Sequence, residues 1–144
     1  MKIIASVLIV LSLVAAIAPQ FLDCQSQGKS LTLQNGKTVP MKCHWTAISM
    51  IAVGGPLFLL GGLLFFSKRK ETQRTLSALG SVSGAFMVAM PTFLIGVCAN
   101  PDMLCNSVMK PTLILTGILA IIAGGGGVLL AWRDEPRQPI AQPA

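Results

Sequence analysis

The stretch Met41-Lys42-Cys43-His44-Trp45 stands where a polar segment runs into a long apolar one, Thr46–Phe66. Three further apolar segments of similar length are Ile3–Leu22, Leu76–Val97 and Pro111–Trp132, and none of the four contains Asp, Glu, Lys, Arg or His. A helix of about 20 apolar residues crosses a hydrocarbon core of about 30 Å. The sequence therefore predicts an all-α membrane protein, a bundle of four transmembrane helices.

The composition is that of a chain embedded in lipid. Of the 144 residues, 53% are hydrophobic and 11% are charged, and tyrosine is absent. The net charge of +6 comes from basic residues that stand in short clusters beside the apolar runs. That placement is typical of membrane topology and not of a phosphate-binding face. The predicted partner is the lipid bilayer, and nucleic acid is not indicated.

Basic residues also predict the orientation in the membrane. The connection between the second and third apolar runs contains Lys68, Arg69, Lys70 and Arg74. Loops rich in Lys and Arg stay in the cytoplasm. We therefore predict a multi-pass protein of a bacterial inner membrane with both termini in the cytoplasm. Residues 1–132 form one domain, residues 23–45 and 98–110 form an extracytoplasmic cap, and residues 133–144, with three prolines, form a disordered cytoplasmic tail.

The first apolar run has a second interpretation as a secretory signal. Ala16-Ile17-Ala18 has the small-x-small form of a cleavage site, and Lys2 gives a thin basic region before the run. Pro19 would directly follow the cut, and the apolar character continues to Leu22. These two features favour a retained helix, although cleavage stays open as the alternative.

The predicted outer cap contains a β-hairpin. Ser30–Gln34 alternates between polar and apolar residues, Asn35-Gly36 follows, and Lys37–Met41 continues the pattern. Asn-Gly between alternating segments is the strongest short hairpin signal, because both central turn positions need positive φ. A lone two-stranded hairpin is marginal in water. We therefore expect a disulfide or a partner to clamp it.

All four cysteines, Cys24, Cys43, Cys98 and Cys105, lie in the predicted cap. Disulfides form and persist outside the cytoplasm, so two structural disulfides are the first expectation. Cys24 with Cys43 and Cys98 with Cys105 would each close one loop, whereas the crossed pairings would tie the two loops together. The sequence leaves the pairing open.

Two chemical alternatives compete with structural disulfides. Met41, His44 and Met103 stand on the same side as the cysteines, and soft sulfur and imidazole ligands suit Cu(I). If the cysteines are oxidised, these three residues are the remaining candidate ligands. A thiol–disulfide redox protein is the other alternative, but the chain has no Cys-x-x-Cys motif to activate a thiol. If the cysteines form structural disulfides, no cofactor is predicted. If the site binds a metal, copper is the candidate.

Small residues on the apolar runs predict close helix contacts. They are Gly80, Gly84, Gly117, Gly124, Gly125, Gly126 and Gly127. Packing within the chain is the simpler interpretation, but four consecutive glycines exceed that need. We therefore expect these glycines, with the amphipathic Trp45, to include a face for another membrane protein.

Three motifs of the chain, together with Pro91 and Pro111, form a recognisable pattern: Met41-Lys42-Cys43-His44-Trp45-Thr46-Ala47, Leu94-Ile95-Gly96-Val97-Cys98 and Met103-Leu104-Cys105. In this pattern the chain resembles a family of small four-helix prokaryotic membrane proteins known only as a domain of unknown function. The resemblance spans roughly Cys24 to Trp132. Members are often encoded beside ABC transporters of the macrolide-exporter type, which implies an accessory role. Ser49-Met50 departs from the family pattern, in which a Glu often follows this His-Trp-Thr-Ala run.

Catalysis and transport by the chain alone are not indicated. The apolar runs contain no ionisable residue to form a proton or ion pathway, and no catalytic motif is present. The sequence with its resemblance therefore predicts a non-catalytic accessory or structural subunit of a larger membrane complex, an ABC-type exporter being the best guess. An extracytoplasmic copper-binding protein and a thiol–disulfide redox protein are the alternatives.

Overall fold

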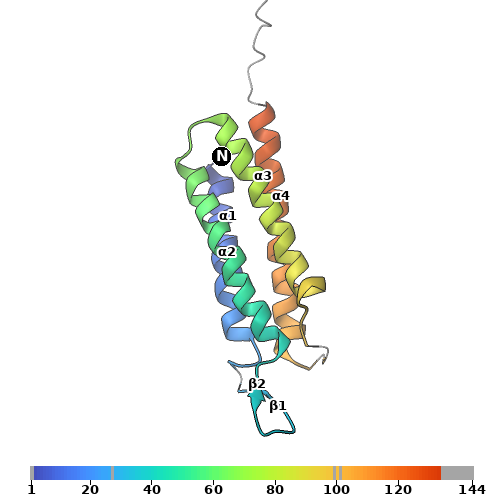
Figure 1. Ribbon diagram of the computed structural model, residues 1–144. Helices are drawn as coiled ribbons and strands as arrows, with labels where there is room; N and C mark the ends of the chain where they lie inside the picture. Colours follow the sequence, from blue (N-terminus) through green and yellow to red (C-terminus); the bar gives the residue numbers. More distant parts are fainter. Residues whose placement is uncertain (1, 27, 99, 101, 134–144) are drawn as a thin grey trace, which may run out of the picture.

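The computed structural model describes residues 2–26, 28–98, 100 and 102–133, so the predicted tail lies almost wholly outside the described part. Four α-helices run along one long axis: α1 (Lys2–Leu22), α2 (Lys42–Phe66), α3 (Lys70–Ala89) and α4 (Lys110–Arg133). Two π-helical turns, η1 (Met90–Leu94) and η2 (Cys105–Met109), end α3 and precede α4. Strands β1 (Leu31–Thr32) and β2 (Thr38–Val39) form a small sheet at one end (Figure 1).

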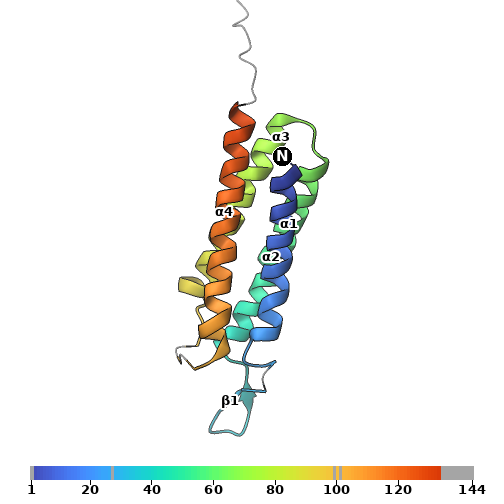
Figure 2. The same ribbon diagram turned by 180° about the vertical axis from the view of Figure 1, so that it is seen from behind.

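The described residues include four helical segments that are long and apolar enough to cross a membrane. Their outer faces carry exposed aliphatic side chains such as Leu59 and Ile122, which suit contact with lipid. Seen from both sides, α1 lies along α2 and α3 along α4 (Figures 1 and 2). The prediction of a four-helix membrane bundle is confirmed.

The two helix pairs are packed through small residues. A Cβ added to Gly61 of α2 would lie 2.8 Å from Cγ1 of Ile9 in α1. A Cβ on Gly84 of α3 would lie 2.9 Å from the carbonyl oxygen of Gly117 in α4. At Gly84 the two backbones approach so closely that only glycine fits, and at Gly61 the crowding comes from the Ile9 side chain. Membrane helices commonly pack through small residues in this way.

The glycines of the predicted partner face fall into two groups. Gly80, Gly84, Gly117, Gly124 and Gly127 all pack against other helices of the chain. A Cβ on Gly126 would meet no atom within 4 Å, and one on Gly125 would meet only Ser81 Oγ, at 3.9 Å. The close packing within the chain that the sequence indicated is therefore present, and Gly125 and Gly126 are the members left with open space.

The sequence predicted a helix that continues to Val97, but in the structure the third apolar run leaves the helix after Leu94. Pro91 has no N–H to donate to the preceding turn, and the ladder widens to η1, in which Ile95 N donates to Met90 O at 3.1 Å. Gly96, with φ of +78°, then turns the chain away from the helix axis. This break frees the segment that carries Cys98.

Helix α2 begins four residues before the predicted start at Thr46. Cys43, His44 and Trp45 therefore lie on its first turns and have directions set by the helix. The hydroxyl of Thr46 donates to the carbonyl oxygen of Gly96 at 2.7 Å, which fixes the segment after η1 against α2. The first turns of α2 thus fix the positions of Cys43, His44 and Trp45, which the sequence analysis singled out.

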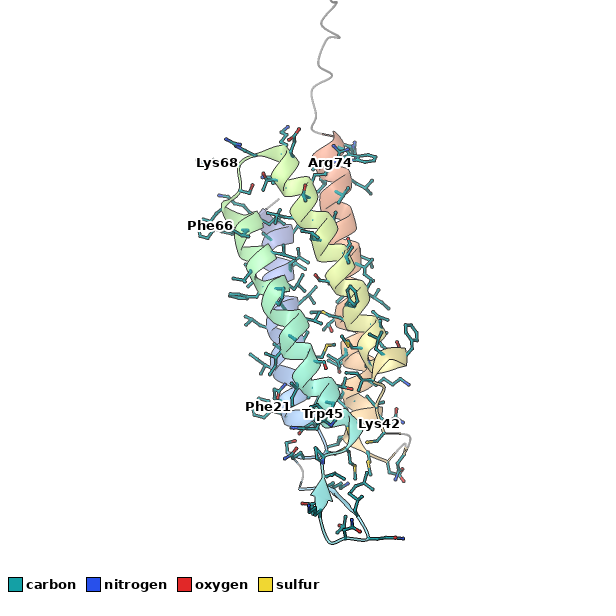
Figure 3. The ribbon with its side chains drawn as sticks, in the orientation of Figure 1. Phe21, Lys42, Trp45, Phe66, Lys68 and Arg74 are labelled. Carbon is teal, nitrogen blue, oxygen red and sulfur yellow. The ribbon has the colours of Figure 1, made fainter. Side chains whose placement is uncertain are left out.

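The two ends of the bundle differ in chemistry. Lys68 and Arg74 lie at one end, whereas Lys42 and Trp45 lie at the other, beside the hairpin (Figure 3). At the first end the guanidinium of Arg74 stacks over the indole of Trp132, 4.5 Å from the ring centroid, and joins α3 to α4. The basic connection and the cysteine-bearing connections are therefore at opposite ends, as the predicted orientation requires.

The hairpin forms where Asn35-Gly36 predicted it. Strands β1 and β2 pair antiparallel, with Leu31 opposite Val39, and Gly36 adopts a φ of +73° in the turn. The hairpin projects beyond the helices (Figure 1). Its exposed strands share no core with the bundle, so it is an appendage of the cap.

Candidate metal centre

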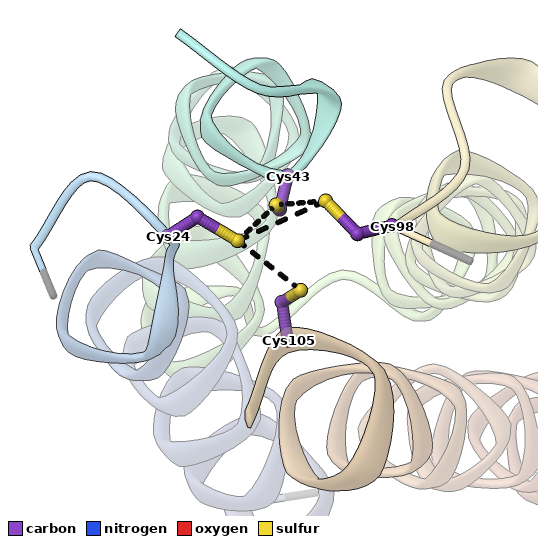
Figure 4. A group of neighbouring side chains, drawn as sticks. All are labelled: Cys24, Cys43, Cys98 and Cys105. Atoms are coloured by element: carbon purple, nitrogen blue, oxygen red, sulfur yellow. Dashed lines mark hydrogen bonds between the residues drawn. The ribbon is translucent and has the colours of Figure 1, made fainter. Parts of the chain in front are cut away.

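The four cysteines meet at the hairpin end of the bundle. Cys24 follows α1, Cys43 is on the first turn of α2, Cys98 follows η1, and Cys105 begins η2. Their four Sγ atoms all lie within 4.8 Å of one another (Figure 4). Four separate segments, from two connections some 60 residues apart in the sequence, thus each contribute one sulfur to a single group, called here the four-sulfur group.

Cys43 makes the two shortest contacts in this group, and Cys24 contacts all three other sulfurs. The Sγ of Cys43 is 2.7 Å from Sγ of Cys24 and 2.8 Å from Sγ of Cys98. Cys24 Sγ is in turn 3.4 Å from Sγ of Cys105 and 3.8 Å from Sγ of Cys98. Each of Cys24 and Cys43 therefore contacts more than one other sulfur.

None of these described separations is a disulfide bond length, which is about 2.05 Å. All four cysteines are free in the structure, so a disulfide-stabilised cap is not seen and stays a prediction. The two shortest contacts are also closer than the roughly 3.5–4.0 Å at which non-bonded atoms pack best.

The group can be compared with a metal site of four thiolates. Zinc–sulfur bonds of about 2.3 Å in a tetrahedron place the sulfurs about 3.8 Å apart. The separations of Cys24 from Cys105 and Cys98, 3.4 and 3.8 Å, are near that value. The two contacts of Cys43, 2.7 and 2.8 Å, are about 1 Å shorter than that value.

Burial controls the protonation of the sulfurs that lie outside the helices. Cys24 is 2% exposed, and its burial, with the hydrogen bonds that its thiol donates to neighbouring sulfurs, raises its pKa above the ordinary value. Burial and the contact with Cys43 raise the pKa of Cys98 to about 11. Both thiols therefore keep their protons at neutral pH unless a cation replaces them, and metal binding would release those protons.

An aspartate and a histidine lie next to the group. His44 Nδ1 and Asp23 Oδ2 are 2.8 Å apart, and the backbone N–H of Ser26 donates to Asp23 Oδ1 at 2.7 Å. Burial opposes ionisation of Asp23, but the hydrogen bonds from His44 and Ser26 outweigh it and lower the pKa of the carboxyl group. Nδ1 of His44 is therefore bonded to Asp23, and only Nε2 of His44 is left for a metal.

The two predicted thioether ligands contact the cysteines directly. Met41 Sδ lies 3.9 Å from Sγ of Cys98, and Met103 Sδ lies 4.0 Å from Sγ of Cys24. Trp45, half exposed, meets the His44 ring edge-on at a centroid distance of 6.3 Å, as suits an anchor at the headgroup layer. The sequence reasoning did not identify Asp23 as a residue of the site. Its position directly before Cys24 could have indicated it.

The fold and the site define a class of protein: a multi-pass membrane protein of four helices with four cysteines gathered at one end. The chain belongs to the family described as Domain of unknown function (DUF4418), whose model matches residues 3–130. The predicted resemblance to a family known only as a domain of unknown function is thereby confirmed. No curated protein and no solved structure matches the chain.

Proposed function

We propose that this protein binds a soft or borderline metal ion through the thiolates of Cys24, Cys43, Cys98 and Cys105 on the outer side of the membrane. The observation that carries the proposal is the convergence of all four Sγ atoms within 4.8 Å. Four thiolates in one group suit zinc, and sulfur ligands also suit Cu(I).

Convergence of this kind exceeds what structural disulfides need. Two disulfides need two separate pairs, and the pairs can lie anywhere in the cap. Here Cys24 contacts all three other cysteine sulfurs within 3.8 Å. A single central ion satisfies all four sulfurs at once, because each ligand then faces the same point.

The proposed site is non-catalytic. Four protein ligands fill a tetrahedral coordination sphere, and such closed sites are structural, whereas catalytic zinc sites keep one position open. Each ligand comes from the outer end of a different helical segment. Metal binding would therefore fasten the outer ends of the bundle to one another, and its binding free energy would add to the stability of the fold.

Cobalt substitution tests this proposal. The protein is purified without oxygen and with a reductant, its metal content is measured, and Co(II) is titrated while the absorption of a tetrahedral cobalt thiolate is recorded. We expect one Co(II) per chain in the wild type, a weakened spectrum in each Cys→Ser variant, and no change in Thr75→Ala, which alters an exposed hydroxyl at the opposite end of the bundle. Absence of bound metal in protein whose four thiols react fully with a maleimide after unfolding would overturn the proposal.

The hairpin favours a second role, as an accessory subunit of a larger membrane complex. Leu31, Leu33 and Val39 are 55%, 47% and 40% exposed on an element that projects beyond the helices. Apolar side chains on a lone hairpin gain stability when a partner covers them. We propose that the hairpin contacts the outer domain of an ABC-type exporter, the kind of complex that the family resemblance implies. Gly125 and Gly126 offer α4 as a contact within the membrane.

Co-purification in a mild detergent tests the accessory role. The tagged chain is compared with a variant in which residues 31–39 are replaced by a Gly-Ser linker, and companions are identified by mass spectrometry. We expect an ABC permease with the wild type and its loss from the variant, while the helical content of both proteins stays equal. A wild-type chain that purifies as a monomer without any companion would contradict this role.

A further inference from the structure

We infer that Met41 and Met103 are thioether ligands that make this site selective for monovalent copper and carry the ion between the outside and the four-sulfur group. The inference rests on the proposed metal site and names the metal it takes. It also extends the site from four sulfurs to six.

The two thioethers reach different members of the group. Met103 Sδ lies 4.0 Å from Sγ of Cys24, and Met41 Sδ lies 3.9 Å from Sγ of Cys98. Met41 directly precedes α2, and Met103 stands in the connection before η2. Thus each connection contributes one thioether, and that thioether contacts a cysteine of the other connection.

Burial orders the six sulfur residues from inside to outside. Cys24, Cys43 and Cys105 are almost completely buried, whereas Met41 and Met103 are half-buried. An ion that arrives from solvent therefore meets Met41, Met103 or the equally half-buried Cys98 before it meets those three cysteines. The methionines occupy the position of an entry shell.

The chemistry of the thioether selects the ion. A thioether is neutral and soft, and it suits Cu(I), whereas zinc is bound by thiolate, imidazole or carboxylate. Cu(I) also accepts few ligands, so it can pass through mixed sets of thioether and thiolate. Each cysteine thiol that binds releases its proton to water, and no electron is transferred.

Packing alone does not account for these two methionines. Methionine commonly fills gaps in a core, and Met50, Met87 and Met109 do so here, with 1% exposure or less. Met41 and Met103 differ from them in two respects, since they are partly exposed and each contacts a cysteine sulfur.

The test is a Met41→Leu, Met103→Leu double variant, because leucine keeps the volume and removes the sulfur. Met90→Leu is the matched control, since Met90 is also partly buried against the core but lies outside the six sulfurs. Cu(I) affinity and transfer are measured without oxygen by competition with the coloured chelator bathocuproine disulfonate, and Co(II) affinity is measured in parallel. We expect the double variant to lose about tenfold to hundredfold in Cu(I) affinity, the usual effect of removing supporting groups around a metal. Its Co(II) affinity and spectrum should be unchanged.

The outcomes separate this inference from the proposed function. Unchanged Cu(I) affinity and transfer in the double variant would overturn the inference, and so would an equal loss of Cu(I) and Co(II) affinity, which would mark a packing defect. Either result leaves the four-thiolate site in place. A wild type that binds neither ion with free thiols would overturn both.

Discussion

His44 Nδ1 lies 2.8 Å from Oδ2 of Asp23, and each of the two residues is the sequence neighbour of a cysteine in the four-sulfur group. Asp23 is only 4% exposed, so the contact is shielded from solvent. It joins the end of α1 to the first turn of α2 and so holds Cys24 beside Cys43. The pair is therefore a positioning contact for the site, although it supplies none of the four sulfurs.

Removal of the Asp23 carboxylate tests this positioning role. Asp23→Ala leaves His44 and the N–H of Ser26 without their acceptor, and losses of this kind cost about 1–3 kcal/mol. We expect a lower melting temperature in detergent by circular dichroism, together with weaker Co(II) binding. Asp102→Ala, at an exposed position of the other cysteine-bearing connection, is the control and should leave both unchanged. Equal effects of the two substitutions would argue against a specific role for Asp23.

The helices were predictable because each apolar run is long enough to span a membrane and free of ionisable residues. The hairpin was predictable because Asn35-Gly36 determines a local turn. The four-sulfur group was not predictable, because the sequence does not show how two loops separated by some 60 residues are placed against each other. The break at Pro91 was also missed, since the apolar run continues through it and only the hydrogen-bond ladder records the change. The Asp23–His44 contact depends on the same tertiary register.

Oxidation is expected to give crossed disulfides. Cys43 contacts both Cys24 and Cys98, so it has two possible partners. The pairs Cys43–Cys98, at 2.8 Å, and Cys24–Cys105, at 3.4 Å, use a close contact for each bond. In the loop-closing alternative, Cys98 and Cys105 are known only to lie within 4.8 Å.

Mass spectrometry of unreduced peptides after treatment of the metal-free protein with diamide checks the pairing. Each disulfide forms as two thiols lose their hydrogens to one diamide, which becomes the hydrazine. Peptides that join residue 43 to 98 and residue 24 to 105 are the expected products. Recovery of the loop-closing pairs, Cys24 with Cys43 and Cys98 with Cys105, would show that the close contacts do not guide oxidation.

The close packing of α3 against α4 predicts opposite effects on stability for alanine substitutions at Gly124 and Gly126. A Cβ on Gly124 would lie 2.6 Å from the backbone nitrogen of Ser81, so Gly124→Ala should destabilise the bundle by about 1–3 kcal/mol. Gly126→Ala is the matched control, because its Cβ meets no atom within 4 Å and alanine favours a helix by roughly 0.5–1 kcal/mol. Unfolding by titration with a denaturing detergent should order the stabilities as Gly126→Ala, wild type, Gly124→Ala. A Gly124→Ala variant as stable as the wild type would mean that the two helices are not this closely packed.

The orientation of the four-sulfur group in the membrane can be tested by labelling. Lys37→Cys lies in the turn of the hairpin and Lys68→Cys in the basic connection at the opposite end of the bundle. Because loops rich in Lys and Arg stay in the cytoplasm, we expect a membrane-impermeant maleimide to label Lys37→Cys in intact cells. Lys68→Cys should be labelled only after permeabilisation, and the wild type, with its native thiols in the buried group, gives the background. The reverse pattern would place the four sulfurs in the reducing cytoplasm, where thiols stay reduced. The hairpin would then be unable to reach an outer domain of any exporter, and the thioethers would exchange copper with the cell interior.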